Sequence, residues 1–171
     1  SLEDGIKMVT KRDEFMQEAA LESDTSMAAV IKLTNEQIEK ICNEFKNIYP
    51  VNYNCPGQVS VSGASSEMEA FAEAVKAAGG RAKMLKVNGA FHSPYMSGAA
   101  EKFRFYLDEV NFTAPKISVY SNFTGDIYTD DICDTLASQI NNPVKWEIII
   151  RKIIDDGFNT FVEIGPGKTL T

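Results

Sequence analysis

The sequence contains a single histidine, His92, within the run GAFHSP (residues 89–94). Histidine has an ordinary pKa near neutral pH, so one imidazole can accept a proton and then release it within a catalytic cycle. The apolar run before it, residues 84–87, is typical of a buried strand, and Ser93-Pro94 is typical of a helix start. Open α/β sheets bind ligands where a strand end meets a helix start. His92 is therefore a candidate general acid–base, and the alternative is a structural histidine satisfied by local hydrogen bonds.

Three further stretches carry polar residues that could contact a ligand. Arg12 lies among polar neighbours in a predicted helix, where an arginine is usually a solvated charge, but its guanidinium is suited to a bidentate grip on a carboxylate. Asn54 lies in NYNCPGQ (residues 52–58), whose amide side chains usually serve turn geometry and could also face a ligand. The run GPGKT (residues 165–169) lacks the GxxxxGK[ST] spacing of a phosphate loop, so we interpret it as a sharp strand-to-helix turn.

A nucleophile motif is missing from these candidates. No GxSxG elbow occurs in the sequence, and the Ser-Gly pairs at 62–63 and 97–98 lack the first glycine. A histidine without a nucleophile cannot by itself support covalent acyl transfer.

Composition excludes several classes of protein. The 44% hydrophobic and 24% charged residues are ordinary for a soluble globular protein, and no apolar run approaches the roughly 18 residues that span a bilayer. The net charge of −7 argues against general nucleic-acid binding. Cys42, Cys55 and Cys133 form no CxxC motif or Cys/His cluster, so we expect neither a metal site nor a disulfide framework. Free thiols and the lack of a signal peptide favour the cytoplasm.

Residues 27–87 are predicted to form a small subdomain with the element order βαββαβ, which matches the ferredoxin-like motif. Strands are predicted at 27–33, 51–54, 58–62 and 81–87. Thr34 and Ser66, each with Gln or Glu three residues later, are predicted to cap the two helices. The first helix should carry its apolar stripe as far as Ile48, and Gly79-Gly80 should end the second.

The flanking residues, 1–26 and 88–171, are predicted to form parts of a larger α/β subdomain. Their apolar spacing indicates helices at 2–20, 94–110, 132–140 and 144–155 and strands at 117–120 and 158–164. Ser1 with Asp4 resembles a capping box at the start of the first helix.

Six runs are informative in combination: DGIKMVTKRDEFMQ (4–17), NYNCPGQ (52–58), GAFHSPYM (89–96), VYSNFTG (119–125), QINNPVKW (139–146) and VEIGPGKTL (162–170). In this order they resemble the malonyl-CoA:acyl carrier protein transacylase family, which shares its fold with the acyltransferase domains of polyketide and fatty acid synthases. GAFHSP with NPV and EIGPGK is a specific combination, whereas any one of them alone would be weak.

The resemblance implies a fold and a role for each candidate residue. The fold is an α/β-hydrolase-like subdomain with a ferredoxin-like insert. His92 matches the catalytic histidine, which pairs with a serine, and Gln139 matches a glutamine whose backbone carbonyl orients the imidazole. Arg12 matches the arginine that binds the free malonyl carboxylate, and Asn54 matches an amide at the substrate cleft. The form Gly-Ala-Phe-His resembles the malonyl-selecting version of its motif.

The implied reaction passes malonyl from malonyl-CoA to serine and then to the phosphopantetheine thiol of acyl carrier protein, in fatty acid biosynthesis. Malonyl-CoA and the carrier protein are the implied partners, with no bound cofactor, metal, nucleic acid or membrane. The family's GHSxG motif and oxyanion-hole glutamine loop precede the first matching run, so this sequence resembles an internal to C-terminal part that is inactive alone. Two alternatives stay open: an acyltransferase domain of polyketide synthesis, and a non-catalytic module that binds carrier protein.

Overall fold

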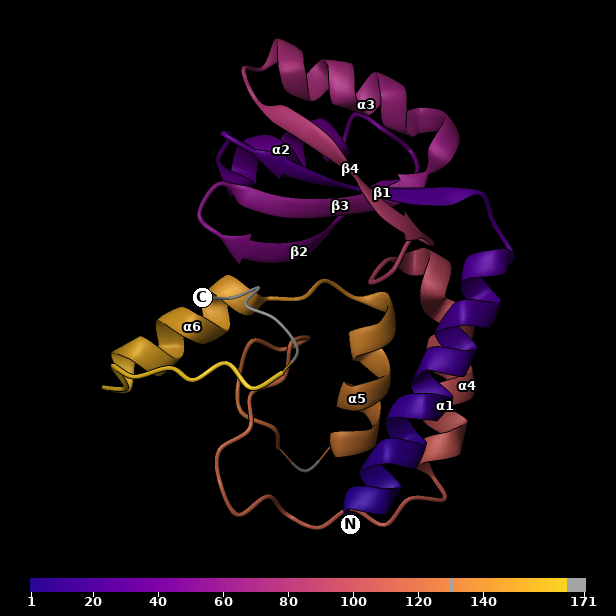
Figure 1. Cartoon of the computed structure of the whole chain (residues 1–171), viewed down its shortest axis with the longest axis vertical. Helices are drawn as coiled ribbons and strands as arrows, with labels where there is room; N and C mark the ends of the chain where they lie inside the picture. The colour runs from indigo at the N-terminus through magenta and orange to yellow at the C-terminus, as the bar shows by residue number, and fades with distance from the viewer. Residues whose placement is uncertain (130, 166–171) are drawn as a thin grey trace.

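The computed structural model describes residues 1–129 and 131–165. Figure 1 shows a small sheet covered by helices at one end of the molecule and a group of helices at the other. The elements are α1 (Leu2–Leu21), β1 (Thr25–Ile31), α2 (Asn35–Cys42), β2 (Ile48–Cys55), β3 (Gln58–Ala64), α3 (Ser65–Ala77), β4 (Arg81–Asn88), the 3-10 turn η1 (Pro94–Met96), α4 (Ser97–Leu107), α5 (Ile132–Asn141) and α6 (Trp146–Asp155).

The sheet has the strand order β2-β3-β1-β4, and every neighbouring pair is antiparallel. Its inward-facing valines, Val30, Val59 and Val61, are fully buried in one core with side chains from both α2 and α3. Because the two helices share that core, they cover the same face of the sheet. The four strands and two helices predicted for residues 27–87 are confirmed.

The predicted helix caps had mixed outcomes. Capping boxes are present at Ser1 and at Thr34, as predicted. The predicted cap at Ser66 is wrong, because α3 already begins at Ser65, after an N-cap residue, Ala64, that makes no side-chain cap. The helix after Thr34 ends at Cys42, and Ile48 instead begins β2, where it pairs with β3. The predicted helix was too long, because the apolar spacing continues into the next strand.

A second core joins α1 to α4 and α5. Met16 and Ala19 of α1 share this core with Met96, Ala99, Phe103 and Leu107, and with Ala137 and Ile140 of α5. The predicted helix 94–110 is observed as η1 followed by α4, which ends at Leu107. This core fixes α1 and α5 on either side of the chain that leaves β4.

Helix α6 begins later than predicted, because the residues before it pair with the small sheet. Val144, predicted to begin the helix, forms a parallel bridge with Asn52 on the edge strand β2. Its N–H donates to the Val51 carbonyl at 2.9 Å, and its carbonyl accepts from the Tyr53 N–H at 2.9 Å. The helix therefore begins at Trp146, and α6 lies beside β2, as Figure 1 shows.

The strands predicted at 117–120 and 158–164 are wrong for the described residues. Tyr120 makes an isolated bridge to Ile127, and residues 158–164 are irregular. A strand needs a hydrogen-bonded neighbour, so an apolar sequence alone does not make one. Residues 166 and 167 of the predicted glycine-rich turn lie outside the described part of the chain.

Gly63 of β3 lies where the neighbouring backbone leaves no room for a side chain. A Cβ added there would lie 1.8 Å from the Asn47 carbonyl oxygen, which accepts a hydrogen bond from the Ala64 N–H at 3.0 Å. Because the obstacle is backbone, Gly63→Ala should lower the free energy of unfolding by about 1–3 kcal/mol, the usual cost of overpacking. Thermal unfolding measures the effect.

Gly98→Ala in α4 is the matched control, because nothing lies within 4 Å of the added Cβ. Alanine there should stabilise the helix by about 0.5–1 kcal/mol. Equal unfolding temperatures for the two variants would contradict the steric argument.

Candidate active site

The loop after β4 holds His92 in an unusual backbone conformation. The φ angle of His92 is 60°, in the left-handed region that a non-glycine residue adopts at a cost of about 1–3 kcal/mol. Buried Ser93 donates its hydroxyl to the Ala90 carbonyl at 2.6 Å and accepts from the Tyr95 N–H at 3.3 Å, which caps η1. Ser62 of β3 donates to the Phe91 carbonyl at 3.2 Å. Hydrogen bonds on both sides of His92 therefore fix this conformation.

The imidazole of His92 is oriented by α5. Its Nδ1 lies 2.8 Å from the backbone carbonyl oxygen of Gln139, which belongs to the last turn of that helix. The last four carbonyls of a helix have no partner within the helix, so this one is free to accept a hydrogen bond. Since a carbonyl only accepts, Nδ1 carries the proton and, in the neutral ring, Nε2 has a free lone pair. The geometry selects the tautomer that a general base requires.

The environment favours the neutral imidazole. Burial lowers the pKa of His92, the positive charge of Arg12 lowers it further, and the hydrogen bond to the Gln139 carbonyl acts in the opposite direction. The net effect is a pKa below the ordinary value, so the unprotonated ring predominates at neutral pH.

Arg12 projects from α1 near His92 and is half-buried. Burial lowers the pKa of its guanidinium and the neighbouring Asp13 raises it, but an arginine stays charged at any physiological pH. Within residues 1–129 and 131–165 the guanidinium makes no ion pair or hydrogen bond, whereas the adjacent Lys11 pairs with Glu14 at 2.6 Å. A half-buried cation with unused donors is a suitable binding group for an anion.

Asn54 lies on the edge strand β2 and borders a cavity that Asn122 also lines. Its side-chain amide on β2 donates to the Ser60 hydroxyl at 3.3 Å, and no hydrogen bond in the described part of the chain joins it to His92, Arg12 or Gln139. It borders a cavity of about 430 Å³. The other lining residues are Asn52, Cys55, Gln58, Asn122, Val144 and Trp146.

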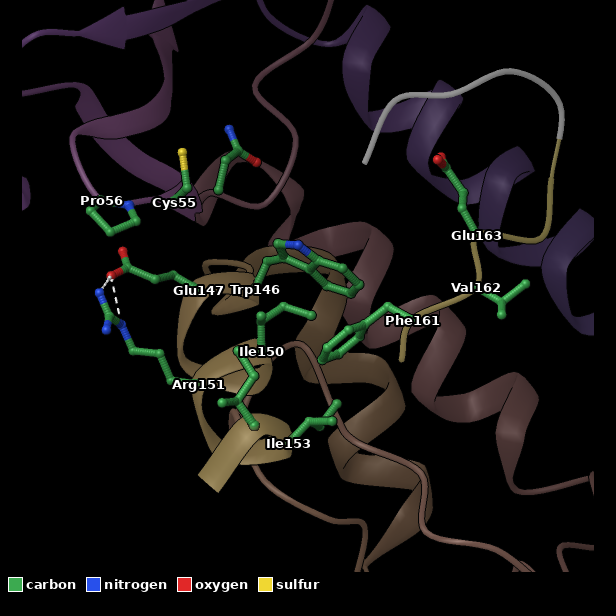
Figure 2. A pocket seen from close by; sticks show the side chains of 12 residues that line it. Cys55, Pro56, Trp146, Glu147, Ile150, Arg151, Ile153, Phe161, Val162 and Glu163 are labelled. Carbon is green, nitrogen blue, oxygen red and sulfur yellow. Dashed lines mark hydrogen bonds and ion pairs between the residues drawn. The ribbon is translucent and has the colours of Figure 1, made fainter. Parts of the chain in front are cut away.

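A larger cavity of about 620 Å³ lies between α6 and the β2–β3 turn. Figure 2 shows Trp146 and Ile150 of α6 facing Phe161, with Cys55 across the opening. The walls are mostly apolar and include neither His92 nor Arg12. This cavity is therefore not where the candidate chemistry lies.

Sequence reasoning missed the residues that hold the site together. The Gln139 side chain accepts from the Asn122 N–H at 3.1 Å and donates to the Tyr128 hydroxyl at 2.6 Å. Ser93 was identified in the sequence as part of a helix start, but Ser62 and Tyr128 carry no local signal, because their partners are distant in sequence.

The described residues contain neither a metal-binding cluster nor a membrane-spanning helix. No group of three or more His, Cys, Asp or Glu side chains is arranged to hold a metal ion. No helix there is long and apolar enough to cross a membrane. All three cysteines are free thiols.

The chain is similar to proteins of known family. A malonyl CoA-acyl carrier protein transacylase from Bacillus subtilis is 38% identical over 178 residues, which cover 100% of this chain and 56% of that protein. The crystal structure of the corresponding protein from Clostridium perfringens has a TM-score of 0.95 at 39% identity, covering 99% of this chain and 55% of that one. The chain thus spans about half the length of the curated relatives it matches.

A second structure contains a malonyl-transacylase in complex with its type II PKS acyl-carrier protein. Its TM-score is 0.93 at 35% identity, over 98% of this chain and 56% of that one. The family model for the acyl transferase domain matches residues 1–171, the whole of this sequence. The resemblance found in six short runs is thereby confirmed, and the chain belongs to the acyl transferase domain family.

Proposed function

We propose that this chain is part of a malonyl-CoA:acyl carrier protein transacylase of fatty acid synthesis. The observation that carries the proposal is the hydrogen bond of His92 to the Gln139 carbonyl beside the half-buried guanidinium of Arg12, which has no ion pair or hydrogen bond within the described residues. The names of the relatives support this activity over an acyltransferase domain of polyketide synthesis or a non-catalytic binding module. The complex of a malonyl-transacylase with its carrier protein supports a carrier protein as the second substrate.

The proposed reaction has two half-reactions on one serine. His92 Nε2 accepts the proton of the serine hydroxyl, the serine oxygen attacks the thioester carbonyl of malonyl-CoA, and the imidazolium returns the proton to the departing CoA thiolate. In the second half, His92 deprotonates the phosphopantetheine thiol, which attacks the acyl-serine, and the serine oxygen recovers the proton. We place that serine in the part of the longer protein that this sequence does not include.

Arg12 is proposed to set substrate choice. A guanidinium that forms two parallel hydrogen bonds to the free malonyl carboxylate would stay unpaired with an acetyl group, which lacks that carboxylate. Asn54 is proposed to border the same substrate cleft. The reaction needs no resident cofactor, because CoA and phosphopantetheine are substrates, and we expect it in the cytoplasm.

The finer architecture is also part of the proposal. Residues 27–87 are taken as a ferredoxin-like insert, which the order β2-β3-β1-β4 and the separate core under α2 and α3 support. Residues 1–26 and 88–171 are taken as parts of an α/β-hydrolase-like subdomain, supported by the core that α1 shares with α4 and α5.

His92→Ala, made in the longer enzyme, should lower kcat by about 10²-fold or more, the usual contribution of general acid–base catalysis.

In the unaltered enzyme, kcat/KM should rise with pH through the His92 pKa, because only the neutral ring accepts the serine proton. Burial and Arg12 hold that pKa low. The midpoint of the acid limb should therefore lie below about 6.5. A malonyl-transfer assay across pH measures both effects, and near-normal turnover by the variant would return His92 to a structural role.

Arg12→Ala should lower kcat/KM for malonyl-CoA by about 10- to 100-fold, because hydrogen bonds between charged groups contribute about 1.5–3 kcal/mol. Transfer of acetyl from acetyl-CoA should be unchanged or faster. Lys11→Ala is the matched control, since Lys11 lies next on α1 and pairs with exposed Glu14. Equal losses with both acyl groups would eliminate the proposed carboxylate contact.

Residues 1–171 alone should not become acylated by malonyl-CoA. The sequence has no GxSxG motif to supply an activated serine, although it carries His92 and Arg12. Intact-mass spectrometry after incubation detects an adduct directly. A stoichiometric malonyl adduct on a serine of this chain would show that the nucleophile was assigned to the wrong segment.

A further inference from the structure

The side chain of Gln139, like its backbone carbonyl, takes part in hydrogen bonds. Its Oε1 accepts from the backbone N–H of Asn122 at 3.1 Å, and its Nε2 donates to the Tyr128 hydroxyl at 2.6 Å. Because a backbone N–H can only donate, the amide must present its oxygen to Asn122 and its nitrogen to Tyr128. Both polar atoms of the amide are thus used, and both partners come from residues 121–128, which we call the polar loop.

The polar loop is closed by its own hydrogen bonds. Its ends are joined by the Ser121 N–H, which donates to the Asp126 carbonyl at 2.8 Å, and by the Tyr128 N–H, which donates to the Val119 carbonyl at 2.9 Å. Fully buried Ser121 accepts from the N–H groups of Phe123 and Thr124 at 3.2 and 3.4 Å. A loop closed in this way is a rigid support for the two groups that hold Gln139.

The polar loop also holds the chain that follows α5. The Asn122 carbonyl accepts from the Lys145 N–H at 2.9 Å, just before α6 begins. The end of α5 is therefore fixed through the Gln139 side chain, and the start of α6 is fixed through Lys145, both against the same loop.

We propose that Tyr128 is a positioning residue for His92, which acts by holding Gln139 so that its carbonyl meets Nδ1. This inference rests on the proposed function for its effect on turnover. Within the described residues the hydroxyl of Tyr128 makes no hydrogen bond to His92, and it acts through Gln139 in the last turn of α5. A misplacement of about 1 Å in a catalytic group can cost about 10²-fold in rate, so this support matters for the reaction.

The charged and polar groups around the imidazole set the sign of the expected pH effect. Arg12 from α1 lowers the His92 pKa, and the Gln139 carbonyl from α5 raises it. Weakening the carbonyl contact removes the raising influence and leaves burial and Arg12 in place. Loss of the Tyr128 hydroxyl should therefore lower the His92 pKa and move the acid limb of the rate profile to lower pH.

Tyr128→Phe in the longer enzyme tests the proposal. We expect kcat to fall about 10-fold with the KM for malonyl-CoA unchanged, and the acid limb to shift to lower pH. Tyr120→Phe is the matched control, because its hydroxyl makes an equally short hydrogen bond, 2.6 Å, to exposed Asp156 instead. The control should keep both kcat and the midpoint of the unaltered enzyme.

A double-mutant cycle with Gln139→Leu separates positioning from general destabilisation. Leucine removes both side-chain hydrogen bonds of Gln139 but keeps its carbonyl, so the double variant with Tyr128→Phe should be no slower than Gln139→Leu alone. Additive losses, a change confined to KM, or a Tyr128→Phe profile equal to that of Tyr120→Phe would overturn the proposal.

NMR titration of the His92 imidazole reports the same geometry without any acyl transfer. The His92 pKa should be lower in Tyr128→Phe than in Tyr120→Phe, and equal values would overturn the positioning role. An unaltered enzyme that transfers no malonyl while the pKa still shifts would refute the proposed function and leave the positioning contact standing.

Discussion

The hydrogen bond from His92 Nδ1 to the Gln139 carbonyl is the interaction on which the candidate site depends. It joins two residues that lie 47 positions apart and uses a carbonyl that the end of a helix leaves without a partner. It fixes the tautomer, leaves Nε2 to accept a proton, and opposes the burial and the Arg12 charge that lower the imidazole pKa. The negative end of the α5 dipole also favours the imidazolium that forms during proton transfer.

The rest of the structure keeps that bond in place. His92 adopts a left-handed φ of 60°, a strained conformation that neighbouring hydrogen bonds must maintain. Ser62 supports the loop from the sheet, and Ser93 supports it from the start of η1. Hydrogen bonds from two separate elements hold this strained backbone. The direction in which the His92 imidazole points therefore depends on the whole fold and not on the loop alone.

The site lies where two separately packed cores meet. One core lies between the sheet and the helices α2 and α3, and the other joins α1, α4 and α5. The loop after β4, which holds His92, leads from one core to the other, and the bridge from Val144 to Asn52 joins the chain after α5 to the opposite edge strand of the sheet. Arg12, His92 and Gln139 come from three different elements, so their approach depends on the packing between those elements.

The sequence by itself determined the features that local chemistry controls. Apolar spacing and capping residues predicted most helices and the four strands of the small sheet, and six short runs identified the family. They also singled out His92, Arg12 and Gln139 as candidates. Only the tertiary structure decided how His92 meets Gln139, that Asn54 donates to Ser60, and that Tyr128 holds Gln139. The physical reason is that strand pairing and side-chain hydrogen bonds between distant residues need a partner in space, which no local pattern encodes.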